Sequence, residues 1–354
     1  MKQHSVFING IGSISIQKEG TLTLPEWGEE NYLRCIDPPF AQYISPALLR
    51  RMSKVVKRGI VGALLALQDG GMEIPDAIIS GTGLGCIEDT EKFLSAMIEQ
   101  NEQFLQPTHF IQSTHNTISS QIAIMLKCYN YNTTFSHLGI SLESALFDGF
   151  LQIKMGMLSN ALINGCDEMT PDYHLMLRKV GFWKRSPFQI EDMHKATTSG
   201  TVAGEGCNSI LLSNEKNEHT YAEINDIQLI HHHEKNNIEE QIRLFLNRNE
   251  LSLSEIDAVM MGTNGDIEND SVYDKLYFEG KDNPTQLIYR HLSGDYFTSS
   301  GFGLIQSARI LKSQDIEPLL YRKESKKDKI QHILFHNHYK NSTHALILLS
   351  VCSN

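Results

Sequence analysis

Two segments of this chain, about half its length apart, share one pattern. The first, DAIISGTGLGCIEDTEKF, begins at Asp76, and the second, DAVMMGTNGDIENDSVYD, begins at Asp257. Each has an Asp-Ala start, an apolar strand, a Gly-Thr turn and an acidic helix beginning. Each also follows an amphipathic helical pattern, at 56–68 and at 238–249. A repeat on this scale indicates that the chain is built from two related halves.

Two weaker matches extend the repeat. Residues 113–127 and 296–312 are both polar turns that lead into helices rich in small residues. Residues 161–168 and 344–351 are both late apolar strands. Because the three matches occur in the same order, we expect the two halves to stack as one body and not to form independent domains.

Apolar runs alternate with helical patterns along the chain, which predicts an α/β fold whose sheets are covered on both faces. We place the boundary between the halves in the polar stretch around 213–221, giving halves 1–215 and 216–354, and we expect 16–45 to be a long loop. The predicted strands are 6–14, 77–83, 133–138, 161–165, 208–214, 221–231, 258–264, 333–337 and 344–350.

The composition excludes several classes of function. A formal net charge of −11 opposes binding to nucleic acid, because phosphate recognition needs a positive surface. No apolar run reaches the roughly 20 residues that a membrane span needs. The first residues lack the basic and apolar regions of a secretory signal, so we expect a cytoplasmic location.

No metal or cofactor is expected. The six cysteines are scattered without a CxxC pair and are expected to be reduced thiols in the core. The run His231-His232-His233-Glu234 is expected to be an exposed loop, because consecutive histidines do not share a face. His336 and His338 do share a strand face, which leaves a metal there as a minor alternative.

A basic helix is predicted at the start of the first half. It carries Arg50, Arg51, Lys54 and Arg58 within the stretch ALLRRMSKVVKR at 47–58. The simple interpretation is a solvated face. The functional alternative is a docking site for an acidic partner.

The stretch TTFSHLGISLESALFDG at 133–149 predicts a strand, a sharp turn and a helix. Enzymes use this local shape to hold a nucleophile at the N-terminus of a helix. The residue at the bend is Gly139, which has no side chain to attack a substrate.

Three stretches resemble the β-ketoacyl synthases of the thiolase superfamily. NTTFSHLGISLESALFDGFLQIKMGMLSNALINGCDE at 132–168 is similar to the family's strand, nucleophile turn, helix and next strand. VMMGTNGD at 259–266 and RHLSGDYFTSSGFG at 290–303 are similar to the family's two histidine motifs. The resemblance implies a thiolase-like fold, with two pseudo-duplicated halves in a layered α/β/α/β/α body.

The resemblance also implies where the family's catalytic residues would fall. The nucleophilic cysteine falls on Gly139, the first histidine on Met261, the second histidine on Asp295 and the lysine on Arg290. The family's glycine-rich closing loop falls near 335–345, a stretch without glycine.

These replacements remove the chemistry of condensation. Glycine cannot form a thioester, methionine cannot donate a hydrogen bond, and an aspartate carboxylate repels a developing oxyanion. We therefore do not expect this chain to condense acyl groups by itself.

Two alternatives remain open. One is an acyltransferase or hydrolase whose rearranged site uses His137, Asp295 or the histidines at 336 and 338. The other alternative is a homodimeric acyl-binding scaffold.

Ser141 is expected to cap the helix. Asp167 and Glu168 are neighbours on a strand, so their side chains are expected to point in opposite directions.

The resemblance favours a chain length factor, the catalytically inactive subunit that pairs with an active β-ketoacyl synthase. The run HLGISLESALFDG is similar to the corresponding stretch in the ketosynthase-like proteins of aryl polyene and flexirubin systems. In such a pair Phe135, His137 and Leu138 would lie near the interface. Phe110 and Ile111 would limit the acyl tunnel, unless they are ordinary core residues. The basic helix would bind an acyl carrier protein.

Overall fold

The structure is a computed structural model that describes residues 4–18, 20–28, 31–103, 105–185, 188–231, 237–277, 283–325 and 329–352. The strands of the first half are β1 (Phe7–Ile14), β2 (Ala77–Gly81), β3 (Tyr131–Phe135), β4 (Asn160–Asp167) and β5 (Gly206–Ser213). Those of the second are β6 (Ala222–His231), β7 (Ala258–Met261), β8 (Thr285–Ile288), β9 (Tyr321–Lys323), β10 (His332–Tyr339) and β11 (Thr343–Ser350).

Helices connect these strands. The α-helices are α1 (Pro46–Leu49), α2 (Lys54–Asp69), α3 (Ile87–Glu99), α4 (Pro107–Gln112), α5 (Thr117–Leu126), α6 (Ser141–Lys154), α7 (Pro171–Val180), α8 (Ile238–Arg248), α9 (Ile267–Tyr277), α10 (Arg290–Ser293) and α11 (Ser300–Ser313). Short 3-10 helices are η1 (Phe40–Gln42), η2 (Leu138–Ile140), η3 (Ile190–Lys195), η5 (Leu253–Glu255) and η6 (Pro318–Leu320).

The strand order confirms the predicted duplication. The described strands form one sheet in the order β3-β2-β4-β5-β1-β6-β11-β10-β7-β8-β9. Leaving out β9, the two sides mirror each other about the β1–β6 pairing. On each side two parallel pairings at the outer end are followed by two antiparallel ones. Thus β2 corresponds to β7, and β4 corresponds to β10.

The aspartates that open the sequence repeat make equivalent hydrogen bonds in both halves. The Asp76 carboxylate accepts the backbone N–H of Asn160, at the start of β4, at 3.3 Å. The Asp257 carboxylate accepts the backbone N–H of His332, at the start of β10, at 3.0 Å. Each aspartate therefore connects the strand that follows it to a neighbouring strand in the sheet, β2 to β4 and β7 to β10.

The two weaker sequence matches are wrong, because they pair elements that are not structural counterparts. Residues 161–168 form β4, whose counterpart by position is β10, whereas 344–351 belong to β11, the counterpart of β5. Residues 113–127 hold α5, which precedes β3, but 296–312 hold α11, which follows β8 as α6 follows β3. Apolar strands and small-residue helices occur more than once in each half, so their composition alone does not identify the counterpart.

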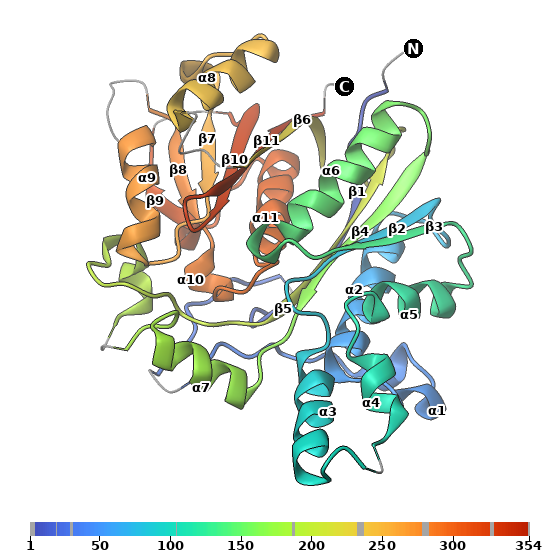
Figure 1. Ribbon diagram of the computed structural model, residues 1–354. Helices are drawn as coiled ribbons and strands as arrows, with labels where there is room; N and C mark the ends of the chain where they lie inside the picture. The colour runs from blue at the N-terminus through green and yellow to red at the C-terminus, as the bar shows by residue number, and fades with distance from the viewer. Residues whose placement is uncertain are drawn as a thin grey trace.

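Three apolar clusters confirm the layered arrangement. The largest contains residues of α6 and α11 together with inward-facing residues of both half-sheets. A second cluster joins α2 and α5 to the first half-sheet, and a third joins α8 and α9 to the second. The order of layers is therefore helix, sheet, helix, sheet, helix, with α6 and α11 at the centre (Figure 1).

All nine predicted strands are present, and two short ones were missed. β8 and β9 have four and three residues, too few for a periodic pattern to stand out. Within 16–45, the described residues contain only η1 and an isolated bridge from Leu33 to Gly204, so the segment is largely a loop. In the described parts of the chain, no helix is both long and apolar enough to cross a bilayer.

Arg58 is a core residue, which corrects its assignment to an exposed basic face. Its side chain is 1% exposed. Its guanidinium contacts Glu205 at 2.8 Å and Asp37 at 2.5 Å. α2 is buried around most of its circumference, so Arg58 falls on a covered face although Lys54, one turn earlier, is exposed. The ion pairs fasten the long N-terminal loop to α2 and β5.

Removing this guanidinium is expected to destabilise the fold. Arg58→Ala leaves Glu205 buried without its counter-charge, which is expected to cost about 3–5 kcal/mol of unfolding free energy. Lys54→Ala is the matched control, because Lys54 is exposed and lies 4.0 Å from Asp37; its expected cost is below about 0.5 kcal/mol. Urea unfolding measures both, and equal losses in the two variants would contradict this role of Arg58.

Candidate functional site

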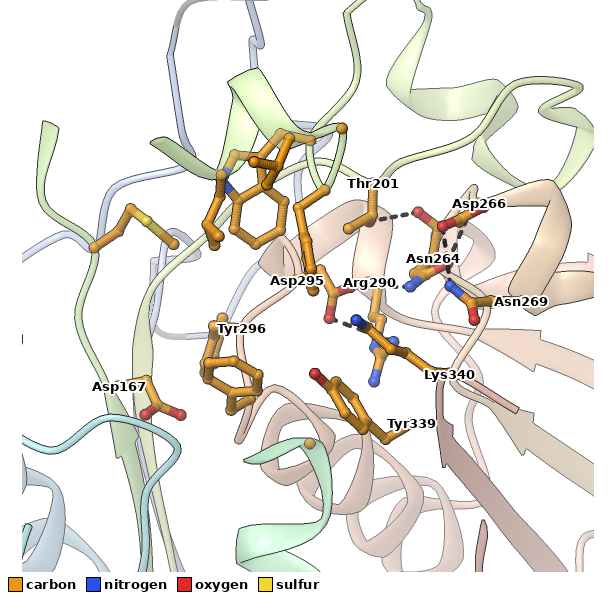
Figure 2. Close-up of a pocket in the computed structure, with 18 of the residues that line it drawn as sticks. Asp167, Thr201, Asn264, Asp266, Asn269, Arg290, Asp295, Tyr296, Tyr339 and Lys340 are labelled. Atoms are coloured by element: carbon orange, nitrogen blue, oxygen red, sulfur yellow. Dashed lines mark hydrogen bonds and ion pairs between the residues drawn. The ribbon is translucent and has the colours of Figure 1, made fainter. Parts of the chain in front are cut away.

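A cavity of about 420 Å³ opens where the two halves meet. Its wall is formed by residues from β4, α7, the segment 181–201, the loop after β7 and the β10–β11 hairpin. Of the residues expected at a degenerate active site, Gly139, Arg290 and Asp295 all line it. Figure 2 shows Arg290, Asp295 and Asn264 on one side of this cavity and Asp167 on the opposite side.

The ring of Tyr339 packs against Gly139, the position to which the resemblance assigned a nucleophile. A Cβ atom on Gly139 would lie 2.5 Å from Cδ2 and 2.9 Å from Cγ of Tyr339. Side chains do not approach each other this closely, so position 139 admits only glycine while Tyr339 keeps its place. The ring centroids of Tyr339 and Phe297 lie 6.1 Å apart.

Tyr339 is positioned by a tight hairpin. It is the last residue of β10 and pairs with Thr343 of β11. Lys340 and Asn341 between them have φ angles of 49° and 51°, the left-handed values that a tight β-hairpin turn uses. The ammonium of Lys340 lies 4.2 Å from the ring centroid of Phe182, which adds a cation–π contact to the segment after α7. A hairpin without glycine thus stands where the resemblance implied a glycine-rich loop.

A buried polar chain continues beneath Gly139. The side-chain amide of Asn337 donates to Glu143 Oε1 at 2.5 Å, and its oxygen accepts from the Arg290 guanidinium at 2.9 Å. Glu143 lies in the first turn of α6 and is fully buried, and this burial raises the pKa of its carboxyl. The chain joins α6 of the first half to β10 and α10 of the second.

Asp295 is held in a neutralising pair. Its carboxylate lies 3.3 Å from the guanidinium of Arg290 and accepts from the side-chain amide of Asn264 at 2.9 Å. These contacts are drawn in Figure 2. An aspartate engaged in this way has its charge balanced and its lone pairs occupied, so it serves poorly as a general base.

Met261 does not line the cavity, which corrects its expected place beside Gly139. It is fully buried in β7, and its side chain belongs to the cluster under α8 and α9. The loop after β7 reaches the cavity through Asn264 and Asp266. Side chains alternate along a strand, so the end of β7 turns Met261 to the outer face.

Asp167 and Glu168 both face the cavity, although they were expected to point apart. The Asp167 carboxylate accepts from Thr82 and Gly83 on one oxygen and from Thr298 on the other, which occupies it structurally. Burial raises the pKa of Glu168 to about 8. This shift favours the protonated, uncharged form of Glu168 near neutral pH.

The histidines of β10 lie in a buried cluster. His336 contacts the ring nitrogen of His344 at 3.0 Å and the hydroxyl of Tyr277 at 2.9 Å, and burial together with the neighbouring imidazoles lowers its pKa well below the usual value. His338 lines the cavity. Within the described ranges, no group of three or more His, Cys, Asp or Glu side chains is arranged to hold a metal ion. His232, His233 and Glu234 lie outside the described residues.

His137 is bound within its own turn. Its backbone N–H donates to Ser141 Oγ at 2.8 Å, and its ring nitrogen Nδ1 lies 2.9 Å from Ser144 Oγ. Ser141 is the first residue of α6, and its hydroxyl closes the turn. His137 does not line the cavity.

The residues expected at a tunnel or interface do not line the cavity. Phe110 and Ile111, on α4, are 57% and 65% exposed, so they are not core residues. Phe135 ends β3 half-buried, and His137 and Leu138 follow it at the surface. Arg50 and Arg51 are exposed near α4, where the side-chain amide of Gln112 bonds to the carbonyl of Arg51.

Sequence reasoning missed the apolar wall of the cavity. This wall comes mainly from α7 and the segment that follows it, with two aromatic residues after Asp295. No motif marks these residues, because their common feature is a position around the cavity. They are Met169, Tyr173, Leu177, Val180, Phe182, Trp183, Tyr296 and Phe297.

A cysteine at position 139 is expected to be incompatible with the packed site. Gly139→Cys forces Tyr339 aside, which is expected to cost about 1–3 kcal/mol of unfolding free energy. In a Tyr339→Ala background the same substitution is expected to cost much less, which a double-mutant cycle detects as coupling. Gly28→Ala is the control, because a Cβ there meets only Asn31 at 3.5 Å. Equal costs of Gly139→Cys in both backgrounds would contradict the packing argument.

Comparison with known proteins identifies the family. The family model described as beta-ketoacyl synthase, N-terminal domain, matches residues 26–243, more than half of the chain. A search of curated proteins returned no match.

Solved structures show the same fold at low sequence identity. The ishigamide ketosynthase/chain length factor matches with a TM-score of 0.79 and 17% identity, over 99% of this chain and 100% of that one. The AntDE:AntF structure, a type II PKS acyl-carrier protein in complex with its ketosynthase, matches with a TM-score of 0.77 and 13% identity, over 99% and 100%.

A beta-ketoacyl synthase from Burkholderia phymatum STM815 matches with a TM-score of 0.76 and 14% identity, over 100% of both chains. These structures confirm the expected thiolase-like fold. With the fold and more than half of its sequence matched, the chain belongs to the beta-ketoacyl synthase family.

Proposed function

We propose that this chain is a non-catalytic subunit of the chain-length-factor type. It pairs with an active β-ketoacyl synthase and shapes the tunnel in which the growing acyl chain lies. The observation that carries the proposal is the ring of Tyr339, which lies 2.5 Å from where a Cβ on Gly139 would be. The nucleophile is absent, and the space it would need is occupied by a side chain of the other half.

The rest of the site supports the loss of chemistry. Condensation needs neutral hydrogen-bond donors beside a developing negative charge. Around Gly139 the polar groups are already engaged with each other, as Arg290 with Asp295 and Asn337 with Glu143. Among the described residues that line the cavity there is no cysteine to carry a thioester.

The edge of the sheet supports a protein partner. β3 is the terminal strand, and in the described part of the chain one side of its backbone pairs with no other strand. Exposed apolar residues accompany this edge and the helices before it, and such surfaces mark contact sites. They are Phe110, Ile111, Ile124, Tyr129, Tyr131 and Leu138.

The comparisons support the kind of partner. One matching structure is described as a ketosynthase/chain length factor, and another as an acyl-carrier protein in complex with its ketosynthase. By analogy, the partner of this chain is an active ketosynthase, and the pair uses an acyl carrier protein. Arg50, Arg51 and Lys54 form the proposed carrier-protein contact, from which the buried Arg58 is excluded. The turn HLGISLESALFDG, similar to aryl polyene and flexirubin systems, suggests a product of that class.

A rearranged acyltransferase or hydrolase has less support. His137 bonds to Ser144 away from the cavity, and Asp295 is paired with Arg290. His336 is buried against Tyr277, with a pKa lowered by burial. His338 lines the cavity, but its ring Nδ1 accepts the backbone N–H of Asn341 at 3.1 Å. Each of these side chains therefore either lies away from the cavity or is engaged in a hydrogen bond or ion pair. A homodimeric acyl-binding scaffold makes a different prediction about assembly.

The decisive assembly experiment is co-expression with an active β-ketoacyl synthase from the same organism. Native mass spectrometry is expected to give a 1:1 heterodimer. A chain that stays monomeric beside a competent ketosynthase would contradict the proposal, and a stable homodimer would favour the scaffold alternative.

Product length provides the functional readout of the same complex. Phe110→Ala enlarges the proposed tunnel and is expected to shift the products toward longer chains, with no loss of heterodimer. Leu244→Ala, at an exposed site on α8, is the control and is expected to leave the products unchanged. An unchanged distribution of product lengths in Phe110→Ala would show that Phe110 does not line the tunnel.

A further inference from the structure

We infer that the β10–β11 hairpin is a pH-sensitive gate in the wall of the cavity. Three imidazoles beneath the hairpin, those of His336, His338 and His344 (the histidine cluster), keep the gate closed while they are neutral. Proton uptake by the cluster releases the end of the hairpin, so that Tyr339 withdraws from Gly139 and the cavity widens. The inference concerns this chain alone and does not depend on the proposed pairing with a ketosynthase.

The three imidazoles form a compact buried group. His336 and His344 are fully buried, and His338 is 5% exposed. The ring centroid of His344 lies 5.3 Å from that of His336 and 5.3 Å from that of His338. The centroids of His336 and His338 lie 6.4 Å apart. Positive charges this close repel each other strongly in a buried site, so the closed hairpin accommodates neutral imidazoles better than charged ones.

A hydrogen bond connects the cluster to the turn of the hairpin. The backbone N–H of Asn341, in the turn, donates to Nδ1 of His338 at 3.1 Å. His338 pairs with His344 across the hairpin, and Tyr339 follows it along β10. A proton on Nδ1 removes the acceptor that this hydrogen bond needs. Protonation of His338 therefore acts directly on the turn that positions Tyr339.

Phenols and apolar side chains cover the cluster. On α9, the ring centroid of Tyr273 lies 5.1 Å from that of His336 and 4.9 Å from that of His338. The hydroxyl of Tyr277 lies 2.9 Å from Nδ1 of His336. Burial raises the pKa of both phenols, so neither carries a charge near neutral pH. α8 adds apolar side chains to the same face of the sheet.

The charged groups on the neighbouring elements bond to other partners. Arg290 of α10 and Glu143 of α6 both bond to Asn337, whose side chain leaves the opposite face of β10. Asp270 of α9 accepts two backbone N–H groups of the loop after β7, and burial raises its pKa to about 7. The ammonium of Lys340, in the turn, lies over an aromatic ring of the segment after α7.

These surroundings hold His336 neutral. Met261 of β7 pairs with it in the sheet, and Ile230 of β6 pairs with His344. Burial, followed by the effect of His344 and His338, lowers the pKa of His336 well below its usual value. In an opened hairpin, an imidazole that meets water regains a pKa of about 6.5. The closed form is therefore most stable above about pH 6.5 and loses stability as the pH falls below it, because the open form takes up protons there.

Hydrogen exchange of the isolated full-length chain, at about pH 7.5 and about pH 5.5, tests the gate. After correction for the intrinsic pH dependence of amide exchange, the protection of amides at 338–344 is expected to fall about tenfold for each histidine that meets water in the open form. Amides of β4 are expected to stay protected, which separates local opening from global unfolding. In protein labelled with 3-fluorotyrosine, the fluorine resonance that Tyr339→Phe removes is expected to shift toward that of an exposed tyrosine over the same interval.

His338→Gln and His344→Gln each remove one titrating group and keep a polar side chain, and each is expected to make the loss of protection about tenfold smaller. His291→Gln is the matched control, because His291 is buried on α10 outside the cluster, where burial lowers its pKa to about 4. It is expected to lose hairpin protection as the wild type does. Protection that does not change with pH in the wild type, or a loss as large as that of the wild type in both cluster variants, overturns the inference. Either result leaves the proposed pairing intact.

Discussion

The contact between Tyr339 and Gly139 links the two halves of this protein at the point where the family carries out its chemistry. Each residue restricts the other: the ring leaves no room for a Cβ at 139, and only glycine leaves room for the ring. Beneath this contact Asn337 bonds to Glu143 of the first half and Arg290 of the second. The bend before α6 is thus a packed junction between α6 and the β10–β11 hairpin.

The polar groups around the junction are paired with each other. Arg290 and Asp295 form an ion pair, and Asn264 completes the bonding of the carboxylate, so the buried charges are compensated. The cavity beside them keeps an apolar wall from α7 and the segment after it. On the other side, the turn before Gly139 presents Leu138 and the β3 edge at the surface. The described structure thus combines a packed junction, a cavity and an exposed strand edge.

Much of this architecture could be predicted from the sequence, because it depends on local periodicity. The nine predicted strands are present, and Asp76 and Asp257 make equivalent hydrogen bonds in the two halves. Features that depend on contacts between distant residues were not accessible. Arg58 has the sequence neighbours of an exposed basic residue, and only the approach of Glu205 shows that it is buried.

The candidate site shows the same limit. Gly139, Arg290 and Asp295 were found by their positions in motifs, and they meet at one cavity. Met261 was misplaced, because the end of β7 turns its side chain to the outer face. Tyr339 carries no motif at all, and its importance follows only from the hairpin that brings it to Gly139. The glycine at the bend is visible in the sequence, but the packing of Tyr339 against it is visible only in three dimensions.

The central claim is that the acyl chain is carried by the partner and never by this chain. Intact-mass spectrometry of the purified heterodimer, after incubation with an acyl-loaded carrier protein, tests it directly. The account predicts an acyl adduct on the ketosynthase subunit and an unmodified mass for this chain. A covalent acyl adduct on this chain would contradict it.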